Sequence, residues 1–292
     1  MSIILDITGR NLRLYFRDRL GVFFSLLAAI ILFLLYTLFL GNLQTQGLQS
    51  SFPDAPDGAV KSFVDSWMFA GIVGITAVTT GLGSFSTFVE DGASGRFRDF
   101  LVSPISRGQL VLGYLLSSFV IALTMTLVVL VASLAYLFFV DGFALTAGQL
   151  ALTVGYLALS CAAYAALSAF VVSFVRTTGA FSALSTIVGT VLGFLCGAYI
   201  PVGSLPEGVA NVINALPFAQ SSMIVRQQFT NGPLDDLAGG QQQAVEGLQA
   251  AYGITAQVGD WEVTVPYVVA ILAAMAVVFT TLAALRIRTR IR

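Results

Sequence analysis

Charged and aromatic side chains are concentrated in one short segment, residues 90–108, which reads E-D-G-A-S-G-R-F-R-D-F-L-V-S-P-I-S-R-G. Such a mixture is typical of a docking surface, because ion pairs fix the register of an interface and a buried aromatic ring anchors it. The chain has no histidine for a catalytic triad or a metal cluster. Its only lysine, Lys61, does not belong to a G-x-x-x-x-G-K-[ST] nucleotide loop. The sequence therefore predicts docking without catalysis, with no catalytic residue, no metal site and no bound cofactor.

The local pattern of this segment predicts a short helix over residues 96–102. Three apolar side chains fall at i, i+3 and i+4, on one face of that helix: Phe97, Phe100 and Leu101. Gly95 breaks the preceding helix, and Pro104 ends the new one, because the residue before a proline is pushed out of the helical region. Ser106 is placed to cap the next helix, which is expected to begin near residue 107. The alternative is a solvated hairpin loop that only joins its neighbours.

The elements around this segment are those of a membrane protein. The chain is 57% hydrophobic and 10% charged, whereas a soluble domain carries roughly a quarter charged residues. Six apolar runs are long enough to cross the bilayer core as helices. They cover residues 21–41, 66–89, 109–140, 148–175, 180–200 and 263–285. The expected fold is a single all-α transmembrane domain over residues 1–292.

The distribution of lysine and arginine predicts the orientation of this domain. Twelve of the 14 lie in the N-terminal segment, in the 90–108 loop, at residue 176 or in the C-terminal tail, and only Lys61 and Arg226 fall on the opposite side. The positive-inside bias then places both termini and the loop in the cytoplasm. Residues 1–20 are amphipathic and predict a helix lying along the inner interface, or alternatively an ordinary basic flank. The excess of arginine over lysine favours a bacterial cell membrane as the location.

The six apolar runs contain no aspartate, glutamate, lysine, arginine or histidine in their cores. An ion-coupled carrier places a titrating or ion-binding group near the membrane midplane, so coupling to protons or sodium is not expected. If the protein performs work, the energy must come from another polypeptide. The docking segment at residues 90–108 is the natural place to receive it.

This segment resembles the inner loop of the type 2 permeases of ATP-binding-cassette (ABC) transporters. The positions that match the family pattern are Glu90, Gly95, Leu101, Ser103, Pro104, Ile105, Ser106, Arg107 and Gly113. The family often has Thr-Leu-Glu after the glycine, whereas this chain has Arg96, Phe97 and Arg98. That departure changes the charge offered to a partner and leaves the particular partner open.

A second resemblance to the same family begins near the end of the fifth run. The matching positions are Gly197, Pro201, Leu205, Pro206, Pro217 and Arg226. In the family this stretch forms a re-entrant helix pair at the outer leaflet. Residues 207–219 are too apolar for a free loop and too short to span. Residues 201–262 are therefore expected to form an extracellular region with a re-entrant segment, in which 227–260 is a small external helix or a loop.

The resemblance implies a permease subunit of an ABC exporter, anchored in the bilayer and not bound to nucleic acid. It would pair with a second permease copy or a paralogue and with two cytosolic ATPase subunits, which would hold ATP and magnesium. The residues expected to couple it to the ATPase are Glu90, Asp91, Gly95, Arg96, Phe97, Arg98, Asp99, Phe100, Leu101, Pro104 and Arg107. The apolar spans favour a hydrophobic or amphipathic cargo, such as a drug, peptide, lipid or glycolipid, and multidrug efflux is one such activity.

Small and hydroxylated residues in the second and fifth runs are candidates for the wall of a transport pathway. They are Thr76, Thr79, Thr80, Ser84, Ser182, Ser185, Thr186, Gly189, Gly193 and Gly197. The alternative is helix packing within one subunit, which small residues also serve. A rival function of another class is a membrane sensor or anchor that recruits a cytosolic ATPase without transporting anything.

Overall fold

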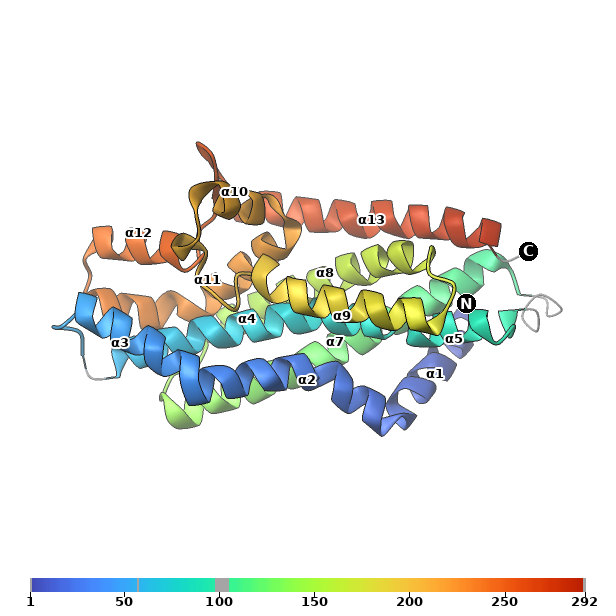
Figure 1. Ribbon diagram of the computed structural model, residues 1–292, viewed down its shortest axis with the longest axis horizontal. Coiled ribbons are helices and arrows are strands. Elements are labelled where there is room, and N and C mark those ends of the chain that lie inside the picture. Colours follow the sequence, from blue (N-terminus) through green and yellow to red (C-terminus); the bar gives the residue numbers. More distant parts are fainter. Residues whose placement is uncertain (1, 57, 98–104, 291–292) are drawn as a thin grey trace.

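The computed structural model describes residues 2–56, 58–97 and 105–290, and this part of the chain is mainly helical (Figure 1). In order, the helices are α1 (Ser2–Arg17), α2 (Arg19–Leu35), the π-helical turn η1 (Tyr36–Leu40), α3 (Gly41–Ser51), α4 (Ala59–Gly83), α5 (Ser86–Ala93), α7 (Arg107–Val140), α8 (Ala147–Val172), α9 (Thr178–Leu195), the 3₁₀ turn η2 (Val202–Ser204), α10 (Glu207–Ala215), α11 (Pro217–Ala238), α12 (Gln242–Ala251) and α13 (Val265–Arg290). An antiparallel hairpin is a small addition to the expected all-α fold. Its two strands, β1 (Gln257–Val258) and β2 (Trp261–Glu262), have two residues each.

Six stretches of the described chain are long and apolar enough to cross a membrane, and each contains most of one predicted run. They are Arg19–Ser51, Ala59–Ala93, Arg107–Val140, Ala147–Val172, Thr178–Leu195 and Val265–Ile287. The first continues beyond residue 41, because the helix passes through η1 into α3 without ending. The fifth ends at Leu195, short of residue 200, because Gly197 adopts a left-handed conformation with φ +60°.

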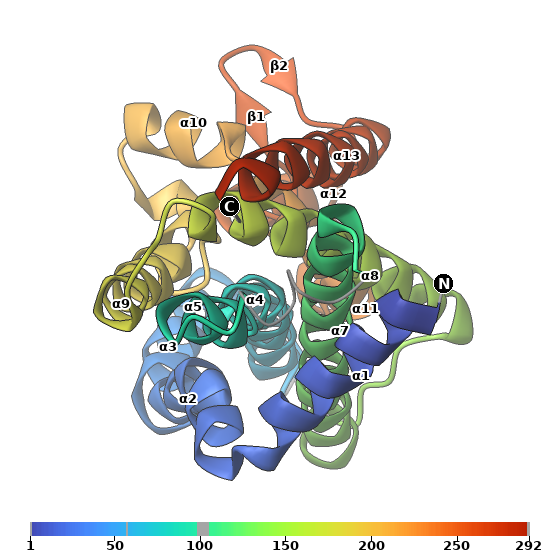
Figure 2. The same ribbon diagram turned by 90° about the vertical axis from the view of Figure 1, so that its right-hand side faces the viewer.

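The helices form an elongated bundle. The N- and C-termini lie at one end with α5, and α3 and α12 lie at the other (Figure 1). These are called the terminal end and the distal end. Seen along the bundle, α4 runs through the middle, with α2, α7, α8 and α9 around it and α13 outside α8 (Figure 2).

The central position of α4 depends on its small residues. A Cβ atom added to Gly71 would lie 2.9 Å from Cβ of Ala198, and one added to Gly74 would lie 3.0 Å from Oγ of Ser222. The absence of side chains here lets neighbouring backbones approach closely, which is the main way helices associate in a membrane. Every residue of α4 from Phe63 to Val78 is buried as a result.

Helix α11 is the largest departure from the sequence-based expectation. Residues 227–238 continue this helix, whereas a loop or a separate external helix was expected there. An exposed segment was predicted because residues 227–238 include glutamine, asparagine and two aspartates. In the structure one side of α11 is buried against α4 and α8, with Phe229, Thr230 and Leu234 in contact with the core. Only α12 is a separate helix in this region, at Gln242–Ala251.

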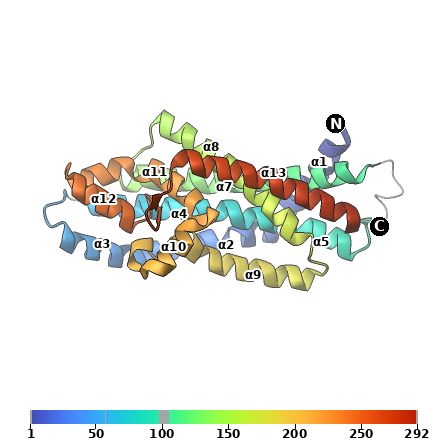
Figure 3. The same ribbon diagram turned by 90° about the horizontal axis from the view of Figure 1, so that it is seen from above.

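Helices α2 and α9 lie at the margin of the bundle, and α9 runs along one edge in Figure 3. In the most apolar stretch of the span that contains either helix, 11% of the residues are buried, against 89% in the span that contains α4. Large apolar side chains on both are exposed, including Phe24 and Ile31 of α2 and Ile187 and Phe194 of α9. These two helices therefore present extensive surface that this chain leaves uncovered.

Candidate functional site

The segment that joins α5 to α7 begins at a buried ionic cluster around Asp91. The Asp91 side chain is fully buried, and both of its oxygens are paired. Arg10 of α1 donates from Nη1 to Oδ2 at 2.7 Å and from Nη2 to Oδ1 at 2.9 Å. Tyr114 of α7 donates its hydroxyl to Oδ2, and Arg96 donates to Oδ1 at 3.2 Å. One carboxylate thus joins α1, α5, α7 and the start of the loop.

This geometry changes the role expected for Asp91. A fully buried carboxylate that is saturated by internal donors cannot also provide a surface contact to another protein. The prediction that it contacts the ATPase directly is therefore corrected: its contacts are intramolecular, and it positions the loop. The hydrogen bond to Asp91 raises the pKa of Arg10 above its ordinary value. The Arg10 guanidinium therefore stays charged throughout the physiological pH range, as an arginine does even at its ordinary pKa. Glu90, the neighbouring acid, is exposed.

Helix α1 is held against α7 by further polar contacts that support the same cluster. Thr8 donates to the carbonyl oxygen of Gly113 at 3.3 Å, and Asn11 donates to the hydroxyl of Ser117 at 3.1 Å. Gly113 permits this approach, because an added Cβ would lie 2.6 Å from a methyl carbon of Ile7. A shift of the loop at Asp91 would therefore act on the whole of α1.

The loop itself is described at its two ends. Gly95 has φ +78°, as its expected role as a helix breaker requires, although α5 already ends at Ala93. Phe97 packs against Phe88 and Tyr114, with ring centroids 5.1 and 6.4 Å apart. Its ring is therefore turned towards its own subunit. At the other end, Ser106 and Gln109 form the capping box of α7, which confirms the expected cap and helix start. Arg98, Asp99, Phe100, Leu101 and Pro104 lie outside the described residues.

Four of the expected pathway residues line two grooves beside α9. Ser182 and Ser185 border a groove of about 420 Å³ at the terminal end, together with Asp18, Glu90 and Arg96. Ser185, Thr186 and Gly189 border a second groove of about 440 Å³ between α2 and α9. Ser185 belongs to both grooves, and its buried hydroxyl has no hydrogen-bond partner within the described chain. The two grooves form a hydroxyl-lined track along the exposed side of the bundle.

The remaining pathway candidates lie elsewhere. Thr76, Thr80 and Ser84 of the second span are buried inside the subunit, where Ser84 bonds the hydroxyl of Ser118 at 2.5 Å and the two threonines bond carbonyls one turn earlier. Thr79 is half-buried and likewise bonds its own helix. These four residues match the alternative of helix packing.

The three glycines of the fifth span that were expected to line the pathway, Gly189, Gly193 and Gly197, form a stripe with a spacing of four residues, and two of them serve the subunit's own packing. Gly193 accommodates the Tyr199 ring, whose Cζ lies 1.9 Å from the position of an added Cβ. Gly197 is no longer helical, and its space is filled by Val202 and Arg226. Of the stripe, only Gly189 remains open for the approach of another element.

A buried arginine holds the chain where it leaves α9. Arg226 of α11 is 1% exposed and donates from Nη2 to the carbonyl oxygens of Cys196 and Gly197, at 2.8 Å each. Its guanidinium lies 5.2 Å from the ring centroid of Trp67. A cation at this place also offsets the partial negative charge at the carboxyl end of α9. Arg226 thus fixes the turn that leads into the expected re-entrant region.

The prolines of that region mark the ends of its elements. Pro201 precedes η2, Pro206 is the N-cap residue of α10, and Pro217 occupies the first turn of α11. Proline is favoured at such positions, because its fixed φ suits a helix start and its missing N–H is not needed there. Leu205 packs against the small apolar cluster formed by Val202, Ile213 and Ala219. Residues 207–219 cover α10 and the first three residues of α11, which continues to Ala238.

Two residues of the ionic cluster had no predicted role. Arg10 was recognised only as part of a basic flank, and Tyr114 only as part of an apolar run. Arg10 and Asp91 are 81 residues apart, so no local spacing relates them. Among the described residues, no group of three or more histidine, cysteine or acidic side chains is arranged to hold a metal ion.

Six long apolar helical stretches, packed around α4, are the architecture of a multi-pass helical membrane protein. The family model described as "ABC-2 family transporter protein" matches residues 41–285. The chain belongs to the ABC-2 family, as the loop and the second motif suggested, and it is the membrane component of an ABC-2 type transporter. ABC-2 permeases generally partner with ABC ATPase subunits. A search of curated proteins returned no match.

Proposed function

We propose that this chain is the permease subunit of an ATP-driven exporter that moves a hydrophobic or amphipathic cargo outward across a bacterial cell membrane. The observation that carries the proposal is the Asp91 cluster. It fixes the start of the loop that carries the family motif to both α1 and α7. A loop tied to two long elements transmits displacement, whereas a free hairpin would absorb it.

In this proposal a cytosolic ATPase binds the loop over residues 90–108. The exposed Glu90 and Arg96 contribute charge to that contact, as do Arg98, Asp99 and Arg107. Phe100 and Leu101 provide its apolar anchor. ATP and magnesium are held by the ATPase, and closure of the ATPase pair pulls on the loop. The Asp91 cluster passes this movement to α1 and α7, and the spans rock to release the cargo.

Replacing Phe100 by aspartate tests the contact with the ATPase. A charge in the apolar anchor disfavours docking, so export is expected to fall at least about tenfold, the equivalent of about 1.4 kcal/mol, while the protein still inserts in the membrane. Transport and ATP hydrolysis are measured together in vesicles that contain the permease and its ATPase. The matched control is Phe139→Asp, at an exposed position near the distal end of α7. Normal export by Phe100→Asp would contradict the coupling role.

The uncovered faces of α2 and α9 are proposed to meet a second permease, either another copy or a paralogue. Both faces carry exposed apolar side chains, and the hydroxyl-lined track runs between them. Two subunits that meet along these helices would close the track into a central pathway. Ser182, Ser185, Thr186 and Gly189 would then line it, and its mixed apolar and hydroxyl wall suits an amphipathic cargo.

A cysteine at position 187 tests this interface. Ile187 of α9 is 62% exposed, and the native cysteines, Cys161 and Cys196, are buried and will not compete for the reagent. Ile187→Cys is expected to give an oxidant-dependent disulfide with the same cysteine of a second copy, or with a cysteine placed at the matching position of a co-expressed paralogue, seen by electrophoresis. Val131→Cys on α7, 66% exposed, is the matched control and should remain uncrosslinked. Equal crosslinking of both variants, or of neither, would contradict the proposed interface.

The terminal end is proposed to be cytoplasmic. Most of the basic residues belong to segments at this end, namely α1, the loop, the α8–α9 connection and the end of α13 (Figure 1). Outward-facing Leu5 and Phe16 lie beside Arg13 and Arg17 on α1, as on a helix at the inner membrane interface. Helices α10 and α11 would then form the re-entrant pair at the outer side.

A further inference from the structure

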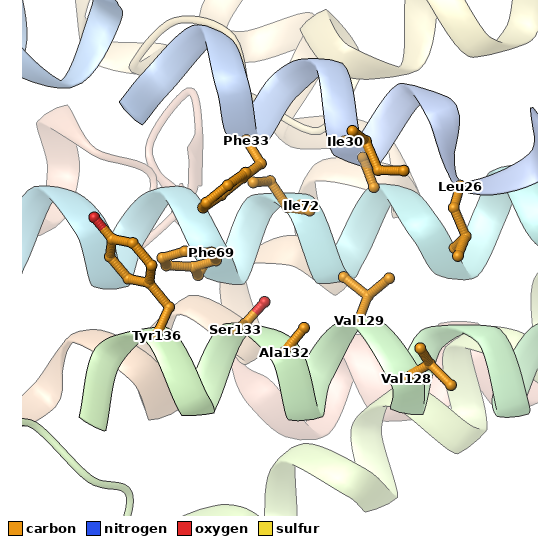
Figure 4. A pocket seen from close by; sticks show the side chains of 11 residues that line it. Leu26, Ile30, Phe33, Phe69, Ile72, Val128, Val129, Ala132, Ser133 and Tyr136 are labelled. Atoms are coloured by element: carbon orange, nitrogen blue, oxygen red, sulfur yellow. The ribbon is translucent and has the colours of Figure 1, made fainter. Parts of the chain in front are cut away.

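An apolar pocket of about 290 Å³ lies between α2, α4 and α7, away from the proposed pathway along α9 (Figure 4). Its walls come from three spans and are nearly all aliphatic or aromatic. The lining includes Leu26 and Phe33 of α2, Phe69 and Ile72 of α4, and Val128 and Tyr136 of α7. Phe33, Phe69 and Tyr136 contact one another, with ring centroids 4.9 to 5.8 Å apart.

A charged cluster lies next to the Tyr136 end of this pocket. The Lys61 ammonium bonds Oδ2 of Asp65 at 2.5 Å and Oδ1 of Asp141 at 2.6 Å, and it lies 5.6 Å from the centroid of the Tyr136 ring. In Figure 4 the Tyr136 hydroxyl points away from the opposite end of the pocket, which is marked by Leu26 and Val128. The pocket and the cluster are therefore neighbours, and Tyr136 lies between them.

The distance between the two parts matches the dimensions of one lipid leaflet. Phe69 and Ile72 follow Lys61 on α4 by 8 and 11 residues, which at 1.5 Å per residue places them ~12–17 Å deeper along the helix. Half of a bilayer's hydrocarbon core is ~15 Å thick. A headgroup beside Lys61 would thus place its acyl chain at the level of the pocket.

The cluster is also complementary to a headgroup that carries one negative and one positive charge. A lysine ammonium has three donors, and two of them are used by the aspartates, which leaves one for a phosphate oxygen. Oδ2 of Asp141 is buried and has no hydrogen-bond partner among the described residues. It is an acceptor without a donor, and two carboxylates against one ammonium leave the cluster net negative. An N–H-bearing ammonium group supplies both the missing donor and the missing charge.

We propose that this surface binds a bilayer phospholipid with a primary amine headgroup, such as phosphatidylethanolamine. The acyl chain fills the pocket between α2, α4 and α7, Lys61 binds the phosphate, and Asp141 accepts a hydrogen bond from the amine. The site is separate from the track along α9, so it binds a resident lipid and not the transported cargo.

Native mass spectrometry of the full chain in detergent tests the site, with phosphatidylethanolamine, phosphatidylcholine and phosphatidylglycerol of identical acyl chains as probes. The unmodified protein is expected to bind the ethanolamine lipid at least about tenfold more tightly than the glycerol lipid. The choline lipid should also bind less tightly, because its quaternary ammonium has no N–H to donate. Equal affinity for the three lipids would overturn the proposed headgroup recognition.

Two variants separate the parts of the site. Ala132 lines the pocket and is exposed, so Ala132→Phe fills the pocket without entering the core, and it is expected to weaken binding of all three lipids at least about tenfold. Val131→Phe, one residue away and outside the pocket, is the matched control and should bind normally. Asp141→Asn should reduce only the preference for ethanolamine. Equal lipid binding by the two phenylalanine variants, with or without a change in oligomeric state, would overturn the proposal.

Discussion

Replacing Arg10 by alanine is expected to lower the free energy of unfolding by about 3 kcal/mol and to uncouple ATP hydrolysis from transport. Breaking a buried ion pair typically costs about 3–5 kcal/mol, because the remaining charge stays buried without its partner. The lower end applies here, since Tyr114 and Arg96 still donate to Asp91. Thermal unfolding of the purified complex measures the stability, and cargo moved per ATP hydrolysed measures the coupling.

Two further variants determine whether the pairing of Arg10 with Asp91 is responsible. Arg13→Ala removes an arginine from an exposed position of the same helix, where Nε bonds the carbonyl of Gly9 one turn earlier, and it should behave as the unmodified protein. Combining Arg10→Ala with Asp91→Asn removes the unpaired charge and should recover about 1–2 kcal/mol relative to Arg10→Ala alone. If Arg10→Ala lowers stability but leaves the ratio of transport to hydrolysis unchanged, the cluster supports the fold without coupling it to the ATPase.

The contrast between Asp91 and its neighbour Glu90 illustrates the limit of sequence interpretation in this loop. Both are acids at the end of an apolar run, and by sequence both were assigned to the ATPase contact. Their environments differ because α1 folds back on α7 and brings Arg10 to only one of them. Long-range pairing of this kind leaves no periodicity in the sequence. Ser106, by contrast, was predicted correctly, because a capping box depends only on residues three positions apart.

The same distinction applies to the fold. The six spans were predictable because each is a local run of apolar residues, and the amphipathic α1 was predictable for a similar reason. Helix α11 was not recognised beyond residue 226, because its polar residues resemble those of a loop. What makes it helical and buried is the surface of α4, where Gly74 leaves space for Ser222. This fit depends on the side chains of two separate segments, so the hydropathy of one segment alone cannot predict it.

The second large effect on stability and transport is expected from a substitution of Arg226. This residue belongs to the second family motif, and it also holds the buried turn after α9. Replacing it by methionine, which is similar in length but donates no hydrogen bond, leaves the carbonyls of Cys196 and Gly197 buried without a partner. Each unsatisfied buried group costs ~1–3 kcal/mol, so a loss of about 3 kcal/mol in the free energy of unfolding is expected. Arg176→Met, at an exposed arginine, is the matched control and should have little effect.

The loss of Arg226 is also expected to impair transport, because the turn that it holds contains a residue of the groove between α2 and α9. Tyr199 lies in this turn and lines the groove between α2 and α9, and Tyr36 of η1 bonds the carbonyls of Ala198 and Tyr199 at 3.1 Å each. Arg226 and Tyr36 therefore hold the same turn from two sides, and Arg226→Met should reduce cargo release at least about tenfold. Arg226→Lys keeps the charge and a donor but loses the planar stacking on Trp67, so it should recover part of the transport. One result would contradict this explanation: Arg226→Lys and Arg226→Met impair transport equally, and Tyr36→Phe has no effect. The hydrogen bonds of the turn would then not control release, and the planar stacking of Arg226 on Trp67 would be the important contact.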